Sequence, residues 1–194
     1  PAAAPQDRFE LRRNDRVGIV GNTLADRMQH SGWMETLLTS RFPEHDLVFR
    51  NLGYSADELD SRPRSENFGT PDQHLTHVKA DVVFAFFGYN EAFGGESGLS
   101  KFRKSLAGFI DRTLQQKYNG KTAPRLVLFS PVAHENLKSP HLPDGTEANT
   151  RLALYTKAMQ DTAREKGVAF VDLFAPTQAE YARAPRPLTI NGVH

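Results

Sequence analysis

Residues 16–24 read Arg-Val-Gly-Ile-Val-Gly-Asn-Thr-Leu, a strand pattern followed by a turn of small and polar residues. Arg16–Val20 is short, mainly apolar and contains β-branched side chains, as buried strands do. Gly21-Asn22-Thr23-Leu24 then places an amide and a hydroxyl directly after the strand. Open parallel sheets bind ligands just outside the carboxyl ends of their strands, so this turn is the first candidate for a functional site.

The same strand pattern recurs along the chain, and helical patterns separate the copies. The further strand-like segments are Leu47–Asn51, Val82–Phe87, Arg125–Phe129 and Val168–Leu173. Apolar residues three or four positions apart, the spacing of one buried helical face, recur in 33–42, 102–114 and 152–163. This alternation predicts an α/β fold in which helices cover both faces of a parallel sheet of five strands.

Segments without these patterns are expected to be loops. Two are long and contain Pro and Gly, namely Ser61–Gln73 and Pro131–Gly145, and we place both on one face of the sheet. A third, Gly94-Gly95-Glu96-Ser97-Gly98, follows the third strand and lacks the Gly-Lys-Ser/Thr of a phosphate-binding loop. We interpret this third segment as a mobile loop beside the site, in the role of a lid.

The composition excludes several functional classes. The chain has 194 residues, a net charge of +1 and no cysteine. The near-neutral charge gives no basis for nucleic-acid binding. The absence of cysteine excludes disulfides, thiolate zinc sites, iron–sulfur clusters and a cysteine nucleophile. The longest apolar run, Val82–Phe87, is far below the roughly 20 residues of a spanning helix, so no membrane insertion is expected.

One domain accounts for this length, since chains of roughly 100–200 residues usually form a single core. We expect the domain to span residues 16–194, after a flexible lead-in over residues 1–15. The lead-in opens with Pro1-Ala2-Ala3-Ala4-Pro5, which resembles the surroundings of a signal-peptide cleavage site. This favours a secreted or periplasmic protein, and the oligomeric state stays open.

Short polar blocks follow the strands in a fixed order. They are Gly21-Asn22-Thr23-Leu24, Gly53 after the second strand, Gly88-Tyr89-Asn90-Glu91 after the third, and Asn191-Gly192-Val193-His194 at the end. In order and spacing the chain resembles the SGNH (GDSL-type) hydrolases over nearly its whole length. The resemblance implies a three-layer α/β/α sandwich with a flavodoxin-like five-stranded parallel sheet in the order 2-1-3-4-5. Family members continue past the last block into a closing helix, so it also implies a domain truncated after His194.

The resemblance also assigns chemical roles. It implies Thr23 as the nucleophile, His194 as general base and acid, and Asn191 as the residue that orients the imidazole. The backbone N–H groups of Thr23 and Gly53 and the side-chain amide of Asn90 form the implied oxyanion hole, where each donor is worth roughly 10²–10³ in rate. The implied function is the hydrolysis of short acyl esters, such as acetyl groups on a carbohydrate or a small molecule, without a cofactor.

Three positions depart from the family pattern. The family has Ser where this chain has Thr23, and Asp where it has Asn22 and Asn191. The extra methyl group of Thr crowds the attacking oxygen. Asn supplies no negative charge to stabilise an imidazolium, and in a serine protease the same Asp-to-Asn change lowers turnover about 10⁴-fold. Glu135 and Asp172 are the candidates to replace the missing carboxylate.

Further polar residues near the blocks are expected to line the substrate pocket. They are Asn22, Glu91, His134, Glu135 and Asn136. His134 and Glu135 are adjacent in the chain, and adjacent side chains point in different directions. We therefore predict no metal site at this cluster.

Each block also has a structural interpretation. Thr23 alone is a common helix cap, Asn90 a common turn former, and His194 a terminal surface residue. The alternative function is a catalytically impaired SGNH-like module that binds a glycan or another ligand in the same cleft. A flavodoxin-like nucleotide-binding domain is a third interpretation, but the first loop lacks the glycine-rich phosphate pattern.

Overall fold

A parallel sheet forms the centre of the computed structural model, which describes residues 9–194. The five strands follow the order β2-β1-β3-β4-β5, and every neighbouring pair is parallel. They are β1 (Arg16–Gly21), β2 (Val48–Asn51), β3 (Val82–Phe86), β4 (Arg125–Phe129) and β5 (Ala169–Val171). The predicted strands and their order are confirmed, and the ends that differ do so by only one or two residues.

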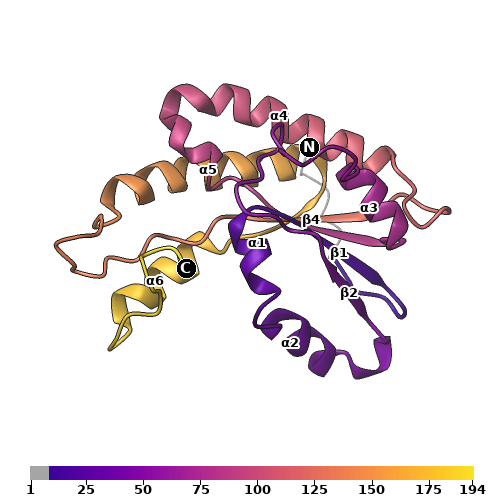
Figure 1. Cartoon of the computed structure of the whole chain (residues 1–194), viewed down its shortest axis with the longest axis horizontal. Coiled ribbons are helices and arrows are strands. Elements are labelled where there is room, and N and C mark those ends of the chain that lie inside the picture. The colour runs from indigo at the N-terminus through magenta and orange to yellow at the C-terminus, as the bar shows by residue number, and fades with distance from the viewer. Residues whose placement is uncertain (1–8) are drawn as a thin grey trace, which may run out of the picture.

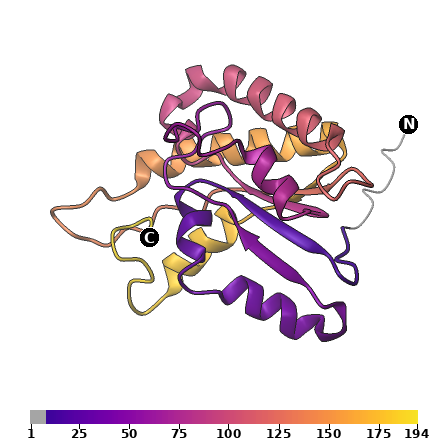
Figure 2. The ribbon, with the colours of Figure 1, turned by 45° about the vertical axis from the view of Figure 1, so that its right-hand side comes forward.

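Helices cover both faces of the sheet, which gives the predicted three-layer α/β/α sandwich. One face carries α3 (Pro71–His77), α4 (Gly95–Gln115) and α5 (Thr146–Lys166), and the other carries α1 (Thr23–Met28) and α2 (Trp33–Arg41) (Figure 1). α6 (Phe174–Arg183) follows β5 and lies near the C-terminus (Figure 2). Two short 3-10 helices are η1 (Pro43–His45) and η2 (Glu91–Gly94).

Each face of the sheet has its own apolar core. In the larger one, Leu106 of α4 and Leu152 of α5 are buried against the sheet. The smaller one joins Ile19 of β1 to Ala25 of α1. Every residue of β3 is buried, as expected for a central strand covered on both sides. The unbroken apolar run of this strand is therefore a consequence of its place in the sheet.

The loop predicted over Ser61–Gln73 is too long, because α3 begins at Pro71. Thr70 Oγ1 accepts a hydrogen bond from Gln73 N–H at 3.2 Å, and the Gln73 side chain accepts one from Thr70 N–H at 2.7 Å. This capping box satisfies two N–H groups at the helix start. Pro71 takes the first helical position, where no N–H is required. The Pro and Gly content of the stretch hides these signals.

The lid predicted for Gly94–Gly98 is wrong. The segment is the end of η2 and the first turn of α4. Tyr155 Oη, on α5, donates a hydrogen bond to Gly95 O at 3.0 Å and ties this turn to the neighbouring helix. The glycines therefore belong to a packed helix start and not to a loop over the site.

The folded domain begins before residue 16. The ring of Phe9 packs edge-on against that of Phe84 in the smaller core, with 6.1 Å between the ring centres. Asp15 is buried and forms an ion pair with Arg125 at the start of β4. Residues 9–15 are therefore not part of the predicted flexible lead-in, and the remainder of that prediction, residues 1–8, lies outside the described part of the chain.

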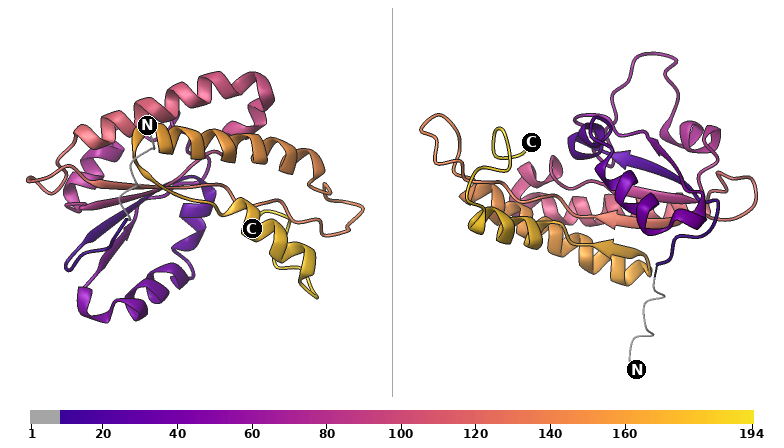
Figure 3. Two further views of the ribbon diagram at one scale, coloured as in Figure 1. Left: turned by 180° about the vertical axis from the view of Figure 1, so that it is seen from behind. Right: turned by 90° about the horizontal axis from the view of Figure 1, so that it is seen from below.

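Two long segments follow the carboxyl ends of strands, residues 52–70 after β2 and residues 130–145 after β4. Figure 3 shows both projecting from the body of the molecule. Because the sheet is parallel, these segments and the turns after β1 and β3 begin at the same edge. That edge carries the candidate site.

Candidate active site

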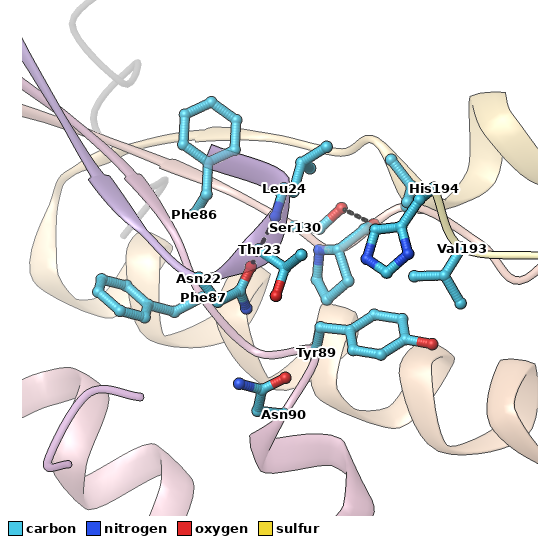
Figure 4. A pocket seen from close by; sticks show the side chains of 12 residues that line it. Asn22, Thr23, Leu24, Phe86, Phe87, Tyr89, Asn90, Ser130, Val193 and His194 are labelled. Atoms are coloured by element: carbon cyan, nitrogen blue, oxygen red, sulfur yellow. Dashed lines mark hydrogen bonds between the residues drawn. The ribbon is translucent and has the colours of Figure 1, made fainter. Parts of the chain in front are cut away.

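A pocket of about 200 Å³ lies between the carboxyl ends of β1 and β3. In this strand order the winding reverses between these two strands, and open α/β sheets bind ligands at such switch points. Its lining residues come from three strand ends and the C-terminus: Asn22, Thr23, Leu24, Phe86, Phe87, Tyr89, Asn90, Ser130, Pro131, Val132, Val193 and His194. Figure 4 shows Thr23, Asn90 and His194 around the same opening. Three of the predicted blocks therefore meet here.

The turn after β1 is shaped by close contact with β3. Gly21 has a φ of +143°, and a Cβ on it would lie 2.2 Å from Phe86 O, so only glycine fits. Asn22 N–H donates a hydrogen bond to the same carbonyl oxygen at 3.0 Å. This contact holds the next residue, Thr23, between the two strand ends.

Asn22, and not Thr23, is the N-cap of α1. Asn22 Oδ1 accepts a hydrogen bond from Leu24 N–H at 3.3 Å. The Asn22 side chain is buried, and its oxygen is committed to the helix. The helix-cap interpretation therefore fits Asn22, while the hydroxyl of Thr23 lines the pocket.

Two donors of the predicted oxyanion hole line this pocket. Thr23 is the first residue of α1, where no carbonyl of its own helix can accept its backbone N–H. Asn90, in the turn after β3, brings a side-chain amide to the same pocket (Figure 4). These are the groups that can donate to a negatively charged oxygen near Thr23 Oγ1.

Gly53, the third predicted donor, is committed elsewhere. Its N–H donates to Asn51 Oδ1 at 2.8 Å, and Asn51 Nδ2 donates to Ala25 O at 2.7 Å. Asn51 thus ties the end of β2 to α1, and Gly53 lies in the wall of a neighbouring pocket. Of the three predicted oxyanion donors, Gly53 is thus the one that does not line the pocket between β1 and β3.

Glu91, predicted to line the pocket, instead braces the turn that carries Asn90. Its carboxylate accepts hydrogen bonds from Gly88 N–H at 2.9 Å and from Leu59 N–H at 3.0 Å. Burial raises the pKa of the Glu91 carboxyl group, although backbone hydrogen bonds oppose the shift. Glu91 therefore holds Asn90 in place and lies outside the pocket.

The Asn191 side chain organises the C-terminal block. Asn191 Oδ1 accepts hydrogen bonds from Val193 N–H at 3.2 Å and from His194 N–H at 2.9 Å. Because two donors require an oxygen on that side, Nδ2 is the atom that faces His194 Nδ1, at 3.1 Å. An amide nitrogen only donates, so His194 Nδ1 accepts, and the neutral imidazole carries its proton on Nε2.

This tautomer opposes general-base catalysis. A base for the Thr23 hydroxyl needs a lone pair on the nitrogen that does not contact Asn191, and here that nitrogen carries the proton. An Asp in the same place would accept the Nδ1 proton and leave Nε2 free. Within residues 9–194, no hydrogen bond joins Thr23 Oγ1 to the imidazole of His194. The Asn191 departure thus changes the tautomer as well as the charge.

The surroundings of His194 also change its proton affinity. Partial desolvation lowers the pKa of His194 from its ordinary value near 6.5, and the nearby Arg27 lowers it further. The imidazole is therefore mostly neutral at pH 7.

Glu135, predicted to line the pocket or to replace the missing Asp, holds the C-terminal segment instead. It is 4% exposed, and its carboxylate accepts hydrogen bonds from Leu188 N–H at 3.0 Å, Thr189 N–H at 2.7 Å and Thr189 Oγ1 at 2.7 Å. Burial acts to raise the pKa of Glu135, but these hydrogen bonds together outweigh it and lower the pKa. Among the described residues, its partners do not include the imidazole of His194.

His134 lies beneath the C-terminal block. Gly192 has a φ of +90°, and a Cβ on it would lie 2.4 Å from His134 Nε2, so glycine lets the block rest on this buried ring. Glu135 N–H donates to Gly192 O at 2.8 Å. His134 and Glu135 were predicted to contact substrate. They instead pack against the C-terminal block and support the segment that carries His194.

Two further predicted residues lie outside the pocket. Asn136 Oδ1 accepts a hydrogen bond from Lys138 N–H at 2.8 Å within the loop after β4. Asp172, the other candidate to replace the missing Asp, accepts one from Ala175 N–H at 3.2 Å at the start of α6. Asn136 thus serves the turn in which it occurs, whereas Asp172 also accepts a hydrogen bond from Ser130 Oγ at 3.4 Å.

The pocket has an apolar wall that was not predicted from the sequence. Phe86 and Phe87 line it just before the predicted third block, Tyr89 lines it within that block, and Val193 lines it within the fourth. The two phenylalanines continue the apolar run of β3, so their pattern indicates only a buried strand. Their position at a strand end, next to a polar block, is the signal that could have identified them.

Ser130 is a second hydroxyl in the pocket wall. It is 1% exposed, and its Oγ accepts hydrogen bonds from Leu173 N–H at 2.8 Å and from Phe174 N–H at 3.1 Å. These contacts join the end of β4 to the start of α6. Ser130 is thus committed to the fold, whereas Thr23 lines the pocket beside Asn90, a predicted oxyanion donor.

Within residues 9–194, no three His, Asp or Glu side chains gather closely enough to hold a metal ion. No helix in this range combines the length and the hydropathy needed to cross a lipid bilayer. The pocket groups with acid–base or donor chemistry include the Thr23 hydroxyl, the Asn90 amide and the His194 imidazole.

Solved structures share this fold. The acetylxylan esterase Axe2 from Geobacillus stearothermophilus has a TM-score of 0.70 and 16% identity, covering 96% of this chain and 89% of that one. LAE5, an α/β hydrolase enzyme from the metagenome of Lake Arreo, Spain, has a TM-score of 0.66 and 17% identity, covering 94% and 88%. BT4096, a gut microbial diltiazem-metabolizing enzyme, has a TM-score of 0.70 and 14% identity; the match covers 94% of this chain but 43% of BT4096. Identities this low show a shared fold alone.

Sequence comparison extends the likeness beyond the fold. No curated protein sequence matches the chain. Residues 12–194 match the family model of the GDSL-like lipase/acylhydrolase family, a span that includes Thr23, Asn90 and His194. The resemblance carried by the strand-end blocks is thus confirmed over nearly the whole chain, which therefore belongs to the GDSL-like lipase/acylhydrolase family.

Proposed function

We propose that this chain is an ester hydrolase that transfers a short acyl group first to Thr23 and then to water. The observation that carries the proposal is the pocket in which the Thr23 hydroxyl, the Asn90 amide and the His194 imidazole meet. Membership of an acylhydrolase family supports it. The pocket volume of about 200 Å³ is below the roughly 300–1,000 Å³ of drug-sized ligand sites, which favours a small acyl group such as acetyl.

The proposed reaction has two steps. Thr23 Oγ1 attacks the ester carbonyl carbon and passes its proton to His194, while Thr23 N–H and the Asn90 amide stabilise the oxyanion. The alcohol then leaves with the proton from His194, and the acyl group stays on Thr23. In the second step, water attacks the acyl group and gives a proton to His194, and the carboxylic acid leaves as the Thr23 hydroxyl is restored.

Asn191 makes this reaction slow. The reactive tautomer carries the proton on His194 Nδ1, and forming it replaces the hydrogen bond from Asn191 Nδ2 with a contact between two donors. The equivalent change in a serine protease lowers turnover about 10⁴-fold. We therefore propose weak turnover of short esters, with acetylated sugars as the substrate class suggested by the name of Axe2.

Hydrolysis of p-nitrophenyl acetate tests the proposal. We expect turnover above the spontaneous rate, and its loss in Thr23→Val, which keeps the side-chain shape without the hydroxyl. Thr36→Val is the matched control, because the Thr36 hydroxyl donates to Gly32 O at 2.8 Å on α2, outside the pocket. Equal rates in the wild type and in a folded Thr23→Val variant would overturn the assignment of the nucleophile.

A second candidate function is a glycan-binding module without turnover. The proton on His194 Nε2 and the commitment of Gly53 N–H to Asn51 favour it. In that case, calorimetric titration detects binding of an acetylated xylo-oligosaccharide, while p-nitrophenyl acetate is not hydrolysed above background. Turnover that depends on Thr23 contradicts this second function.

A further inference from the structure

A second pocket, of about 430 Å³, lies beside the carboxyl ends of β1 and β2. Its outer wall is the segment between β2 and α3, which projects from the molecule in Figure 3. Among the described residues, the two pockets share no lining residue. Its volume falls within the range of roughly 300–1,000 Å³ that is typical of small-molecule sites.

Arg62 brings a positive charge to this second pocket, and no residue among 9–194 forms an ion pair with it. Its Nε donates to Glu58 O at 3.3 Å, and in residues 9–194 its two terminal nitrogens have no hydrogen-bond partner. The guanidinium carbon lies 5.0 Å from the ring centre of Phe87 and 5.6 Å from that of Phe109, so the aromatic rings hold it by cation–π contacts. The terminal nitrogens are available to a ligand that enters the pocket.

The carboxylates near Arg62 are engaged by other residues. Asp57 accepts two hydrogen bonds of 2.7 Å from Arg64, and Asp72 accepts one of 2.5 Å from Tyr118 Oη. Burial lowers the pKa of the Arg62 guanidinium, and the negative charges of Asp57 and Asp72 oppose this shift. A guanidinium nevertheless stays protonated at neutral pH. Arg62 is therefore a partly desolvated cation, and an anionic ligand would replace the interactions that it lost from water.

Two aromatic rings line the same pocket and remain half exposed. Tyr54 is 49% exposed and Phe68 is 47% exposed, and their ring centres lie 6.5 Å apart. The guanidinium carbon of Arg64 lies 3.9 Å from the ring centre of Tyr54 and fixes that ring. Aromatic surface exposed beside a pocket is suited to contact with a flat ligand.

We propose that this second pocket binds a small molecule made of a six-membered ring that carries one carboxylate. The terminal nitrogens of Arg62 donate to the two carboxylate oxygens in parallel, and the ring packs on Tyr54 and Phe68. A monoanion is favoured over a phosphate dianion, because Asp57 and Asp72 lie near enough to repel a second negative charge. The proposal does not rest on the proposed esterase function, because its test measures binding and not turnover.

Calorimetric titration of the chain with benzoate tests this proposal. We expect saturable binding of benzoate, at least about tenfold weaker binding of neutral benzamide and of acetate, which lacks the ring, and weaker binding of inorganic phosphate. Titration with glucuronate distinguishes a sugar acid from an aromatic acid. Whichever of glucuronate and benzoate binds more tightly identifies the kind of ring that the pocket accepts. Equal affinity for benzoate and benzamide, tightest binding of phosphate, or no saturable binding of either ring carboxylate overturns the proposal.

Variants assign the binding to Arg62. Arg62→Met removes the charge and should weaken benzoate binding at least about tenfold. Arg62→Lys keeps the charge without the planar pair of donors, so its benzoate affinity should lie between those of the wild type and Arg62→Met. Arg50→Met is the matched control, because Arg50 is exposed on β2 and its Nη1 donates to Phe49 O at 2.8 Å. Unchanged benzoate affinity in a folded Arg62→Met variant contradicts the proposal. If that variant unfolds, the comparison of benzoate with benzamide on the native chain still decides.

Discussion

The two halves of the candidate active site are built in different ways. Thr23 stands in a turn held by the sheet, where Asn22 N–H pairs with Phe86 O and Asn22 Oδ1 caps α1. His194 ends a segment that contains neither helix nor strand and is held by hydrogen bonds to Glu135. The side that carries Thr23, the proposed nucleophile, thus depends on regular secondary structure. The side that carries His194, the proposed base, depends on a few contacts between residues far apart in the sequence.

The departures from the family pattern differ between the two halves as well. Thr23 keeps the hydroxyl that the reaction needs and adds only a methyl group. Asn191 keeps the shape of Asp but reverses the direction of one hydrogen bond, because its nitrogen faces the imidazole. The same kind of small substitution therefore has a larger chemical consequence on the base side.

Asn191→Asp is expected to have the largest effect on kcat, because it restores the carboxylate beside His194 and leaves the Thr23 side unchanged. A carboxylate would accept the His194 Nδ1 proton, leave Nε2 as the base and stabilise the imidazolium, raising kcat by up to about 10⁴-fold. The measurement is kcat for p-nitrophenyl acetate. Asn136→Asp, the same change in a loop outside the pocket, should leave kcat unchanged. An unchanged or lower rate in a folded Asn191→Asp variant would argue against His194 as the base.

Asn90→Leu removes a donor from the nucleophile side. Loss of one oxyanion donor lowers kcat by about 10²–10³-fold, and KM changes little because the interaction forms mainly in the transition state. The effect is best measured in the Asn191→Asp background, because the higher kcat expected there leaves a wider measurable range above the spontaneous rate of hydrolysis. Asn136→Leu is the control outside the pocket. A drop that falls mainly on KM would place Asn90 in substrate binding.

Glu135→Gln disturbs the base side through its support. One amide nitrogen would face a backbone N–H of Leu188 or Thr189, and a buried unsatisfied donor costs about 1–3 kcal/mol of stability. The folded-state pKa of Glu135 is lowered from about 4.5, so its contribution is fully present above that pH and is lost as the pH falls through the folded-state pKa.

Urea unfolding at several pH values measures this difference. We expect a constant gap in unfolding free energy between wild type and Glu135→Gln at neutral pH, and a gap that narrows below about pH 4.5. Glu147→Gln is the control, because Glu147 is 89% exposed on α5. A gap that does not narrow in acid would mean that the Glu135 charge contributes nothing to folding.

Arg27→Gln is expected to have the smallest effect, which is a shift in the pH dependence of kcat/KM that the His194 imidazole determines. The base must be neutral, so kcat/KM rises with pH through a midpoint below about 6.5, where desolvation and Arg27 have lowered the His194 pKa. Removing Arg27 raises that midpoint by a fraction of a unit, since exposed charges are screened. Arg50→Gln should not move it. An identical profile in both variants would exclude Arg27 as a cause of the shift.

Much of the fold was predictable because central parallel strands must be apolar on both faces. Val82–Phe86 is buried throughout, and its run of apolar residues needs no partner to be recognised as a strand. Prediction failed where one residue type serves two purposes. Pro71 and Gly95 begin helices in this chain, although Pro and Gly are equally typical of loops.

The candidate site was predictable as a set of blocks but not as a set of contacts. Gly53, Glu91 and Glu135 follow strand ends, as expected. None of the three lines the pocket between β1 and β3. Gly53 N–H binds a side chain two residues earlier, while Glu91 and Glu135 bind the backbone of Leu59 and Leu188. Those backbone partners are 32 and 53 positions away in the chain, beyond the reach of any local pattern.

The amino-acid sequence alone specifies the five strands and the polar residue Thr23 that follows the first of them, because recognition of buried apolar runs requires only residue type and spacing, whereas the strand order was implied by the family resemblance. It also specifies that Asn191 replaces a carboxylate. The folded chain decides that Asn191 turns its nitrogen toward the imidazole, since two backbone N–H groups occupy its oxygen. Residue type determines which groups can donate or accept, and the three-dimensional position of the backbone determines which of them do.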